Sequence, residues 1–114
     1  MKNDEVFDLT LLQLDAATVS AQSLETIGEA VLRAPGDLVL LPEMFATGFR
    51  PDATAVAQPA DGEIVSALRG WAAESGKAVA GSVAVRDGAT LRNRLFFAHP
   101  SGELAWYDKR HLFR

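Results

Sequence analysis

The chain has 114 residues, of which 48% are hydrophobic and 23% charged, a composition typical of one globular domain with a real core. A net charge of −4, with Lys and Arg scattered along the chain, argues against a nucleic-acid partner. No segment approaches the roughly 20 apolar residues that span a bilayer, so no membrane partner is predicted. There is no cysteine, and two histidines with no ligand spacing leave little for a metal site. We therefore predict a soluble cytoplasmic protein without a metal.

The first third of the chain predicts a strand, a helix and a second strand. Residues 6–14 form a short apolar run, which predicts a strand buried on both faces. Leu24, Ile27 and Val31 follow at helical spacing, and Pro35-Gly36 ends that helix. Residues 37–41 predict a second buried strand, which a helical crossover of this length makes parallel to the first.

The rest of the chain predicts a second helix and three more strands. Asp61 is the expected N-cap of a helix whose apolar face carries Ile64, Leu68 and Trp71, and Gly76 is the expected C-terminal cap. Trp71 is predicted to lie in the core. Strands are expected at residues 78–85, 90–98 and 104–108, the first two joined by an Asp-Gly hairpin turn.

These elements occur in the order β-α-β-α-β-β-β, which predicts an α/β fold in which parallel strands pass into an antiparallel meander. A mixed sheet with helices on one face fits this order. The Gly-rich dinucleotide fingerprint does not follow the first strand, where Gln13, Leu14 and Asp15 stand instead. Residues 1–114 are expected to form a single domain.

Two ionisable residues follow apolar runs, where open α/β sheets place their sites. Glu43 follows the second strand, and its apolar neighbours would raise its pKa toward the range of a general base. A lone Glu in such a place is more often a solvated or ion-paired acid. Phe45 and Phe49 are equally consistent with core packing and with the wall of a substrate pocket beside Glu43.

Lys109 follows the fifth strand and could stabilise an oxyanion. Taken alone, it reads better as a solvated lysine whose stem lies on Trp106 or Tyr107. Asp108 and Arg110 are expected to form a local surface ion pair. His111 is expected to be packed or hydrogen-bonded, and Asn93 is given a structural role.

Four strings, taken together and in this order, resemble the N-terminal part of the nitrilase, or carbon–nitrogen hydrolase, superfamily, and are similar to its omega-amidase-like branch. The strings are Leu12-Gln13-Leu14-Asp15, the run from Leu40 to Phe49, Asn93-Arg94, and the run from Trp106 to Phe113. The resemblance implies an α-β-β-α sandwich whose N-terminal portion is residues 1–114. It also implies homo-oligomers of the full-length form and no cofactor.

The resemblance further implies two of three catalytic residues. Glu43 would take the thiol proton of a cysteine, and Lys109 would stabilise the tetrahedral intermediate. The substrates implied are small molecules, the terminal amides of short dicarboxylates, although amide, nitrile and carbamoyl hydrolysis share this Glu and Lys.

The nucleophile of that triad is absent from these 114 residues. We expect the cysteine to lie beyond Arg114, and we expect the chain by itself to have no amidase activity. The alternative is a non-catalytic relative that serves as a small-molecule-binding or dimerising module of the same fold.

Overall fold

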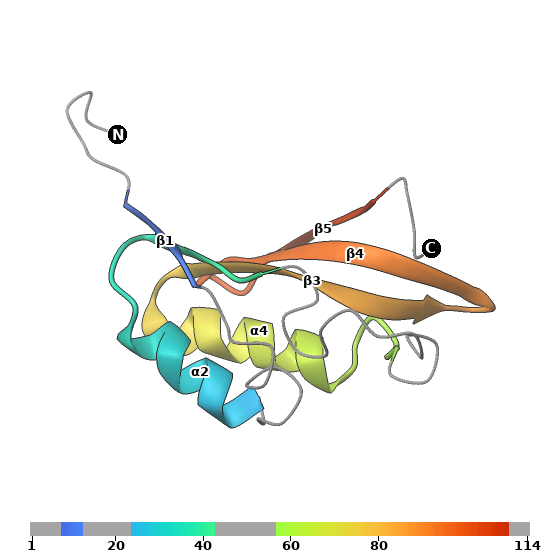
Figure 1. Cartoon of the computed structure of the whole chain (residues 1–114), viewed down its shortest axis with the longest axis horizontal. Coiled ribbons are helices and arrows are strands. Elements are labelled where there is room, and N and C mark those ends of the chain that lie inside the picture. The colour runs from blue at the N-terminus through green and yellow to red at the C-terminus, as the bar shows by residue number, and fades with distance from the viewer. Residues whose placement is uncertain (1–7, 13–23, 43–56, 110–114) are drawn as a thin grey trace.

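One mixed sheet organises the chain, in a computed structural model that describes residues 8–12, 24–42 and 57–109 (Figure 1). Its strands lie in the order β1-β2-β3-β4-β5. β1 and β2 pair in parallel, as do β2 and β3, whereas the pairs β3–β4 and β4–β5 are antiparallel. The predicted parallel start and antiparallel meander are therefore confirmed. The bounds are Leu9–Leu11 for β1, Leu38–Leu40 for β2, Ala78–Asp87 for β3, Thr90–Ala98 for β4 and Leu104–Asp108 for β5.

Two helices form where the apolar spacing predicts them. α2 spans Leu24–Arg33 and α4 spans Glu63–Ser75. Gly76 ends α4 in the left-handed region at φ 71°, and its N–H donates to the carbonyl of Ala72 at 3.0 Å. The ammonium of Lys77 donates to the carbonyls of Val31, at 2.9 Å, and Ala34, so a cation satisfies the last turn of α2. Neither helix is long and apolar enough to cross a membrane, as judged on the residues that the structure describes.

The N-terminus of α4 corrects one prediction. The N-cap is Gly62 rather than Asp61, and Gly62 has no side chain to cap with. Gln58 supplies the missing acceptor, because its Oε1 accepts the N–H of Ile64 at 2.9 Å. Gln58 can do this because its backbone forms a bridge with Val85 of β3, which fixes it beside the start of the helix.

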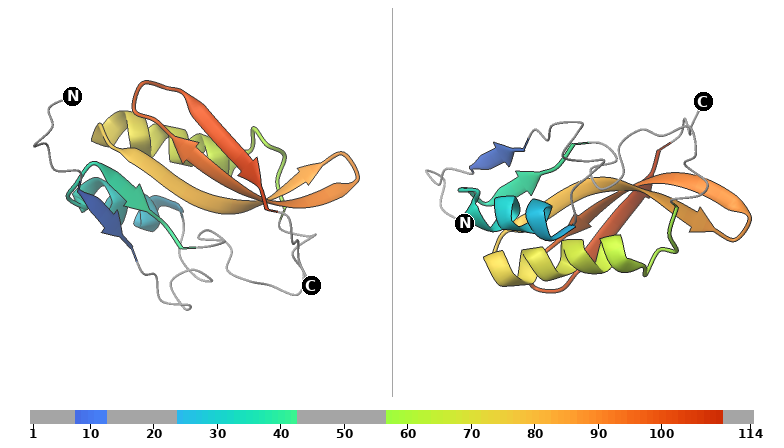
Figure 2. Two further views of the ribbon diagram at one scale, coloured as in Figure 1. Left: turned by 90° about the horizontal axis from the view of Figure 1, so that it is seen from above. Right: turned by 60° about the horizontal axis from the view of Figure 1, so that its bottom comes forward.

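Both helices lie on the same side of the sheet (Figures 1 and 2). Strand residues alternate between the two faces, so every second strand residue faces the helices. Trp71 is buried in this core, as predicted. The main contributors are Ile27 and Val31 from α2, Ile64, Leu68 and Trp71 from α4, and Val39, Val79, Val83, Phe96 and Ala98 from the sheet.

The face of the sheet that neither described helix covers, hereafter the open face, leaves the first strand exposed, which corrects the prediction that this strand is buried on both faces. The central strand β3 is nevertheless buried on this face as well, at Ala80 and Ala84. Leu9 is 51% exposed and Leu11 is 65% exposed. In β2, Val39 is fully buried on the helix side, whereas Leu38 and Leu40 are only half-buried. The apolar runs are as predicted, but the two helices cover only one of their faces.

Candidate functional site

Lys109 is the predicted site residue that the structure describes. Glu43, Phe45 and Phe49 lie outside the described residues, as does His111, so their roles stay predictions. Lys109 follows the last residue of β5 and is half-buried. Its backbone N–H donates to the carbonyl of Asn93 at 2.9 Å, which continues the β4–β5 ladder one residue beyond the strand.

The alternation of the sheet places Lys109 on the open face. Trp106 and Asp108 lie opposite Phe96 and Arg94, and Phe96 belongs to the helix-side core. Lys109 and Asn93 are the next position of that ladder, so they face away from the helices. Asn93 is buried, and on this face it lies beside Ala84 of β3. The lysine therefore leaves the sheet on the side that the helices do not cover.

β2 and β5 run in the same direction, because two antiparallel pairings separate β5 from β3. The register can be followed across the sheet: Leu40 is opposite Ala80, Ala80 is opposite Phe97, and Phe97 is opposite Ala105. Leu41 extends β2 further, since its N–H donates to the carbonyl of Ala80 at 2.8 Å. The carboxyl ends of β2 and β5 therefore point to the same edge of the sheet.

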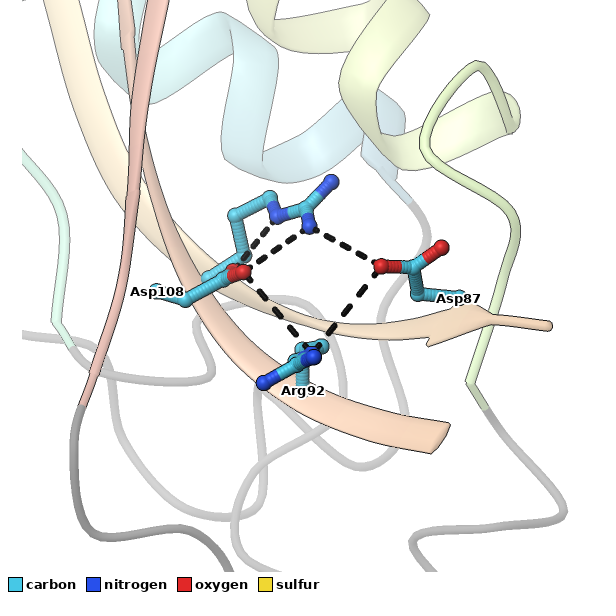
Figure 3. Close-up of polar contacts among 4 residues, drawn as sticks. Asp87, Arg92 and Asp108 are labelled. Carbon is cyan, nitrogen blue, oxygen red and sulfur yellow. Dashed lines mark hydrogen bonds and ion pairs between the residues drawn. The ribbon is translucent and has the colours of Figure 1, made fainter. Parts of the chain in front are cut away.

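A cluster of four charged residues lies where β3 and β5 end and β4 begins (Figure 3). Arg94 holds Asp108 with two bonds, Nε to Oδ1 at 2.6 Å and Nη2 to Oδ2 at 3.0 Å. Longer contacts complete the cluster: Asp87 lies 3.7 Å from Arg94 and 3.9 Å from Arg92, and Asp108 lies 3.8 Å from Arg92. The guanidinium of Arg94 also lies 3.9 Å from the ring centre of Trp106.

Arg94 is the buried member of this cluster. Its side chain is 7% exposed, whereas that of Asp108 is 23% exposed. The hydrogen bonds from Arg94 lower the pKa of Asp108 against the opposing effect of burial, with a further contribution from the charges of Arg94 and Arg92. The same pair raises the pKa of Arg94 above its already high ordinary value. Both groups therefore stay ionised at neutral pH.

Sequence reasoning did not find the Arg94–Asp108 pair. It expected Asp108 to pair with Arg110, which lies outside the described residues, whereas the structure pairs Asp108 with a residue of the neighbouring strand. One signal was available. Arg92 and Arg94 alternate with other residues along the strand, on the same face as Phe96 and Ala98, so two charges had to be compensated beside a buried apolar face.

These features can be compared with known proteins. The family model for carbon-nitrogen hydrolases matches residues 10–114 of this chain. The chain belongs to the carbon-nitrogen hydrolase family. It is 38% identical over 112 residues to the omega-amidase YafV of Yersinia enterocolitica, and it is 38% identical over 78 residues to the omega-amidase YafV of Escherichia coli K12.

The match covers 93% of this chain and 42% of the Yersinia protein, and 68% of this chain and 30% of the Escherichia coli protein. The chain therefore spans less than half the length of the curated relatives it matches. The omega-amidase-like resemblance seen in the four sequence strings is confirmed at this level.

Solved structures of this superfamily share the fold. The carbon-nitrogen hydrolase superfamily protein XC1258 from Xanthomonas campestris, which carries an arsenic adduct in its active site, superposes with a TM-score of 0.73 at 38% identity. That match covers 94% of this chain and 40% of the other. A C145S mutant of the Nesterenkonia AN1 amidase, from the nitrilase superfamily, gives a TM-score of 0.74 at 29% identity, with 93% and 44% covered. The predicted fold class is therefore confirmed as the nitrilase α/β fold.

Proposed function

We propose that this chain contributes two residues, Glu43 and Lys109, to the Glu-Lys-Cys triad of an omega-amidase. Such an enzyme releases ammonia from the terminal amide of a small dicarboxylate. The observation that carries the proposal is the shared direction of β2 and β5 together with their register. Family membership and 38% identity to proteins named as omega-amidases support the reaction class.

The register supports a meeting of the two residues. Leu40, the last residue of β2, lies level with Ala105 of β5. Along the sequence, Glu43 follows Leu40 by three residues and Lys109 follows Ala105 by four. If both segments continue in the strand direction, Glu43 and Lys109 both lie beyond the carboxyl ends of the strands, at the same end of the sheet. The carboxyl edge is where open α/β sheets bind their ligands.

The chemistry that follows divides into two half-reactions. Glu43 takes the proton of a cysteine thiol, and the thiolate forms a bond to the amide carbon. The ammonium of Lys109 stabilises the oxyanion of the tetrahedral intermediate. Collapse breaks the carbon–nitrogen bond, and ammonia leaves with the proton from Glu43. Water then attacks the thioester with Glu43 as base, which releases the carboxylate and restores the thiol.

The whole-protein features belong to the same proposal. The cysteine is supplied from outside these 114 residues, which contain none. We place the full-length enzyme in the cytoplasm as a homo-oligomer acting on a small amide. The 114-residue chain alone is expected to release no ammonia above background. Release by the pure chain that is unaffected by a thiol reagent would contradict the triad mechanism.

The test removes the ammonium of Lys109 in a full-length protein that carries this segment. We expect Lys109→Met to lower kcat for a short dicarboxylate ω-amide about 100- to 1000-fold, because it removes one oxyanion donor. Lys77→Met is the matched control: it removes the ammonium that donates to the last turn of α2. This control should lower the free energy of unfolding and leave kcat unchanged. A Lys109→Met enzyme with wild-type kcat would refute the assignment.

A further inference from the structure

Lys109 lies at the last ladder position of β5, an edge strand of the sheet as far as the structure describes it. β5 is the final strand of the described sheet, and Lys109 lies one residue beyond its end. Its backbone N–H donates to the carbonyl of Asn93, which ties it to β4. Strand ends of this kind open locally at low free-energy cost. The place of the Lys109 ammonium therefore depends on what holds the end of β5 against β4.

The Arg94–Asp108 pair stands directly beside that bond. The backbones of Asn93 and Lys109 are joined by a ladder hydrogen bond. In an antiparallel ladder the next opposite pair, Arg94 and Asp108, therefore has no backbone hydrogen bond between its two members. Side chains of such pairs lie closer together than those of hydrogen-bonded pairs. The backbone at position 108 has no ladder bond of its own to Arg94, and the side chains supply the cross-strand tie instead.

The tie is stiff as well as strong. Arg94 makes two charge-assisted bonds to both oxygens of Asp108, which fixes the plane of the carboxylate. The guanidinium lies over the Trp106 ring and is nearly buried. It thus holds two alternate residues of β5, 106 and 108, against β4. The strand cannot peel from its end without breaking these contacts.

We propose that Arg94 and Asp108 are a positioning pair that locks the end of β5 and so sets the place of Lys109. The proposal rests on the catalytic role proposed for Lys109. The pair acts from the helix face of the sheet, whereas Lys109 leaves on the open face. Arg94 and Asp108 therefore act on the reaction only through the backbone of β5.

Arg92 offers a matched control within the same cluster. It lies two residues before Arg94 on the same strand and the same face, and it carries the same charge. Its contacts with Asp87 and Asp108 are 3.9 and 3.8 Å, and its side chain is 39% exposed. Such a loose and half-solvated contact contributes little restraint. Loss of Arg92 removes an equal charge and leaves the bidentate tie intact.

The first measurement is amide hydrogen exchange of the full-length protein that carries this segment, resolved by NMR. Arg94→Met should raise the exchange rate of the Lys109 amide about 10- to 100-fold, the range expected for loss of a charge-assisted bond. Amides in the middle of β3 should change far less, and Arg92→Met should leave Lys109 within about twofold of wild type. Arg94→Lys, which keeps the charge and loses the fork, should give an intermediate increase. An unchanged Lys109 amide in both Arg94 variants would overturn the proposal, as would an equal increase at Lys109 and in β3.

The second measurement is kinetic and uses the full-length protein. Arg94→Met should lower kcat about 10-fold or more with little change in KM, because a misplaced lysine weakens the transition state more than substrate binding. Arg92→Met should keep kcat near wild type. If the backbone N–H of Lys109 exchanges faster in Arg94→Met and kcat does not fall, the pair has no positioning role. Failure of the proposed function is seen separately, as a wild-type kcat in Lys109→Met.

Discussion

The two faces of the sheet both carry apolar side chains, and these differ in exposure. On the helix side, Val39, Val79 and Phe96 are almost fully buried under α2 and α4. On the other side, Leu9 and Leu11 of β1 and Phe97 of β4 are substantially exposed. The difference teaches that strand composition does not decide burial here. The two helices cover one face, whereas the central strand β3 is buried on both faces.

Phe96 and Phe97 give the sharpest test of this contrast, because they are adjacent, identical and on opposite faces. Phe96 is 1% exposed and Phe97 is 38% exposed. We expect Phe96→Ala to lower the free energy of unfolding by about 3–5 kcal/mol, the usual cost of emptying a buried phenylalanine site. Phe97→Ala should cost about 1 kcal/mol or less. Urea unfolding followed by circular dichroism measures both, and equal losses would mean that both faces are covered.

The helix layer itself depends on a close contact between α2 and α4. A Cβ built on Gly28 would lie 2.3 Å from Nε1 of Trp71, so no larger residue fits there without a shift. We therefore expect Gly28→Ala to lower the free energy of unfolding by about 1–3 kcal/mol, as overpacking does.

Gly70 provides the control, because a Cβ at this helical glycine meets no atom within 4 Å. Gly70→Ala should stabilise the chain by about 0.5–1 kcal/mol, the ordinary gain of alanine over glycine inside a helix. Thermal unfolding of the two variants should move the midpoint in opposite directions. A stabilising Gly28→Ala would show that the two helices are not in tight contact.

The smallest of these three effects concerns the Arg94–Asp108 pair, which lies on the helix-side face of the sheet. The pKa of Asp108 is lower in the folded chain than its ordinary value of 3.8, so the unfolded chain binds its proton more readily. The stability contributed by the pair is therefore complete above that ordinary value and is lost as the pH falls through the folded pKa. Asp108→Asn should cost about 1–2 kcal/mol at pH 7, and the cost should shrink below about pH 4.

The measurement is urea unfolding of wild type and Asp108→Asn across pH 2–7 (a range chosen to bracket the ordinary pKa of an aspartate). Arg92→Met serves again as the comparison, with a change of about 0.5 kcal/mol or less, since its contacts are long and half-exposed. A difference in the free energy of unfolding between wild type and Asp108→Asn that does not vary with pH would show that the carboxylate charge of Asp108 does not stabilise the fold.

The elements themselves could be predicted well. The fourth and fifth strands, at residues 90–98 and 104–108, were placed with their observed bounds, and the cap at Gly76 was found. Period-2 alternation, helical spacing and turn residues are local signals, and no tertiary contact overrode them at these two strands and at Gly76. The cap at Asp61 was wrong because Gln58, held against β3 by backbone bonds, reached the helix start instead. That bridge joins Gln58 to Val85, which local rules do not relate.

The site could be predicted only in part. Lys109 was identified by its place after a strand and by the string around it, and the structure puts it at the end of β5. Arg94 was not found, since its importance depends on lying opposite Asp108, fourteen residues away in the sequence. Glu43, Phe45 and Phe49 remain predictions from the sequence.

By itself, therefore, the sequence determined the order of the elements, the family and the identity of the candidate catalytic residues. Each of these depends on residue type and short-range spacing, which the chain carries along its length. Only the tertiary structure decided which face of the sheet the helices cover, that the carboxyl ends of β2 and β5 point the same way, and that Arg94 holds Asp108. Those outcomes depend on strand register and helix placement, which arise from contacts between residues far apart in the sequence.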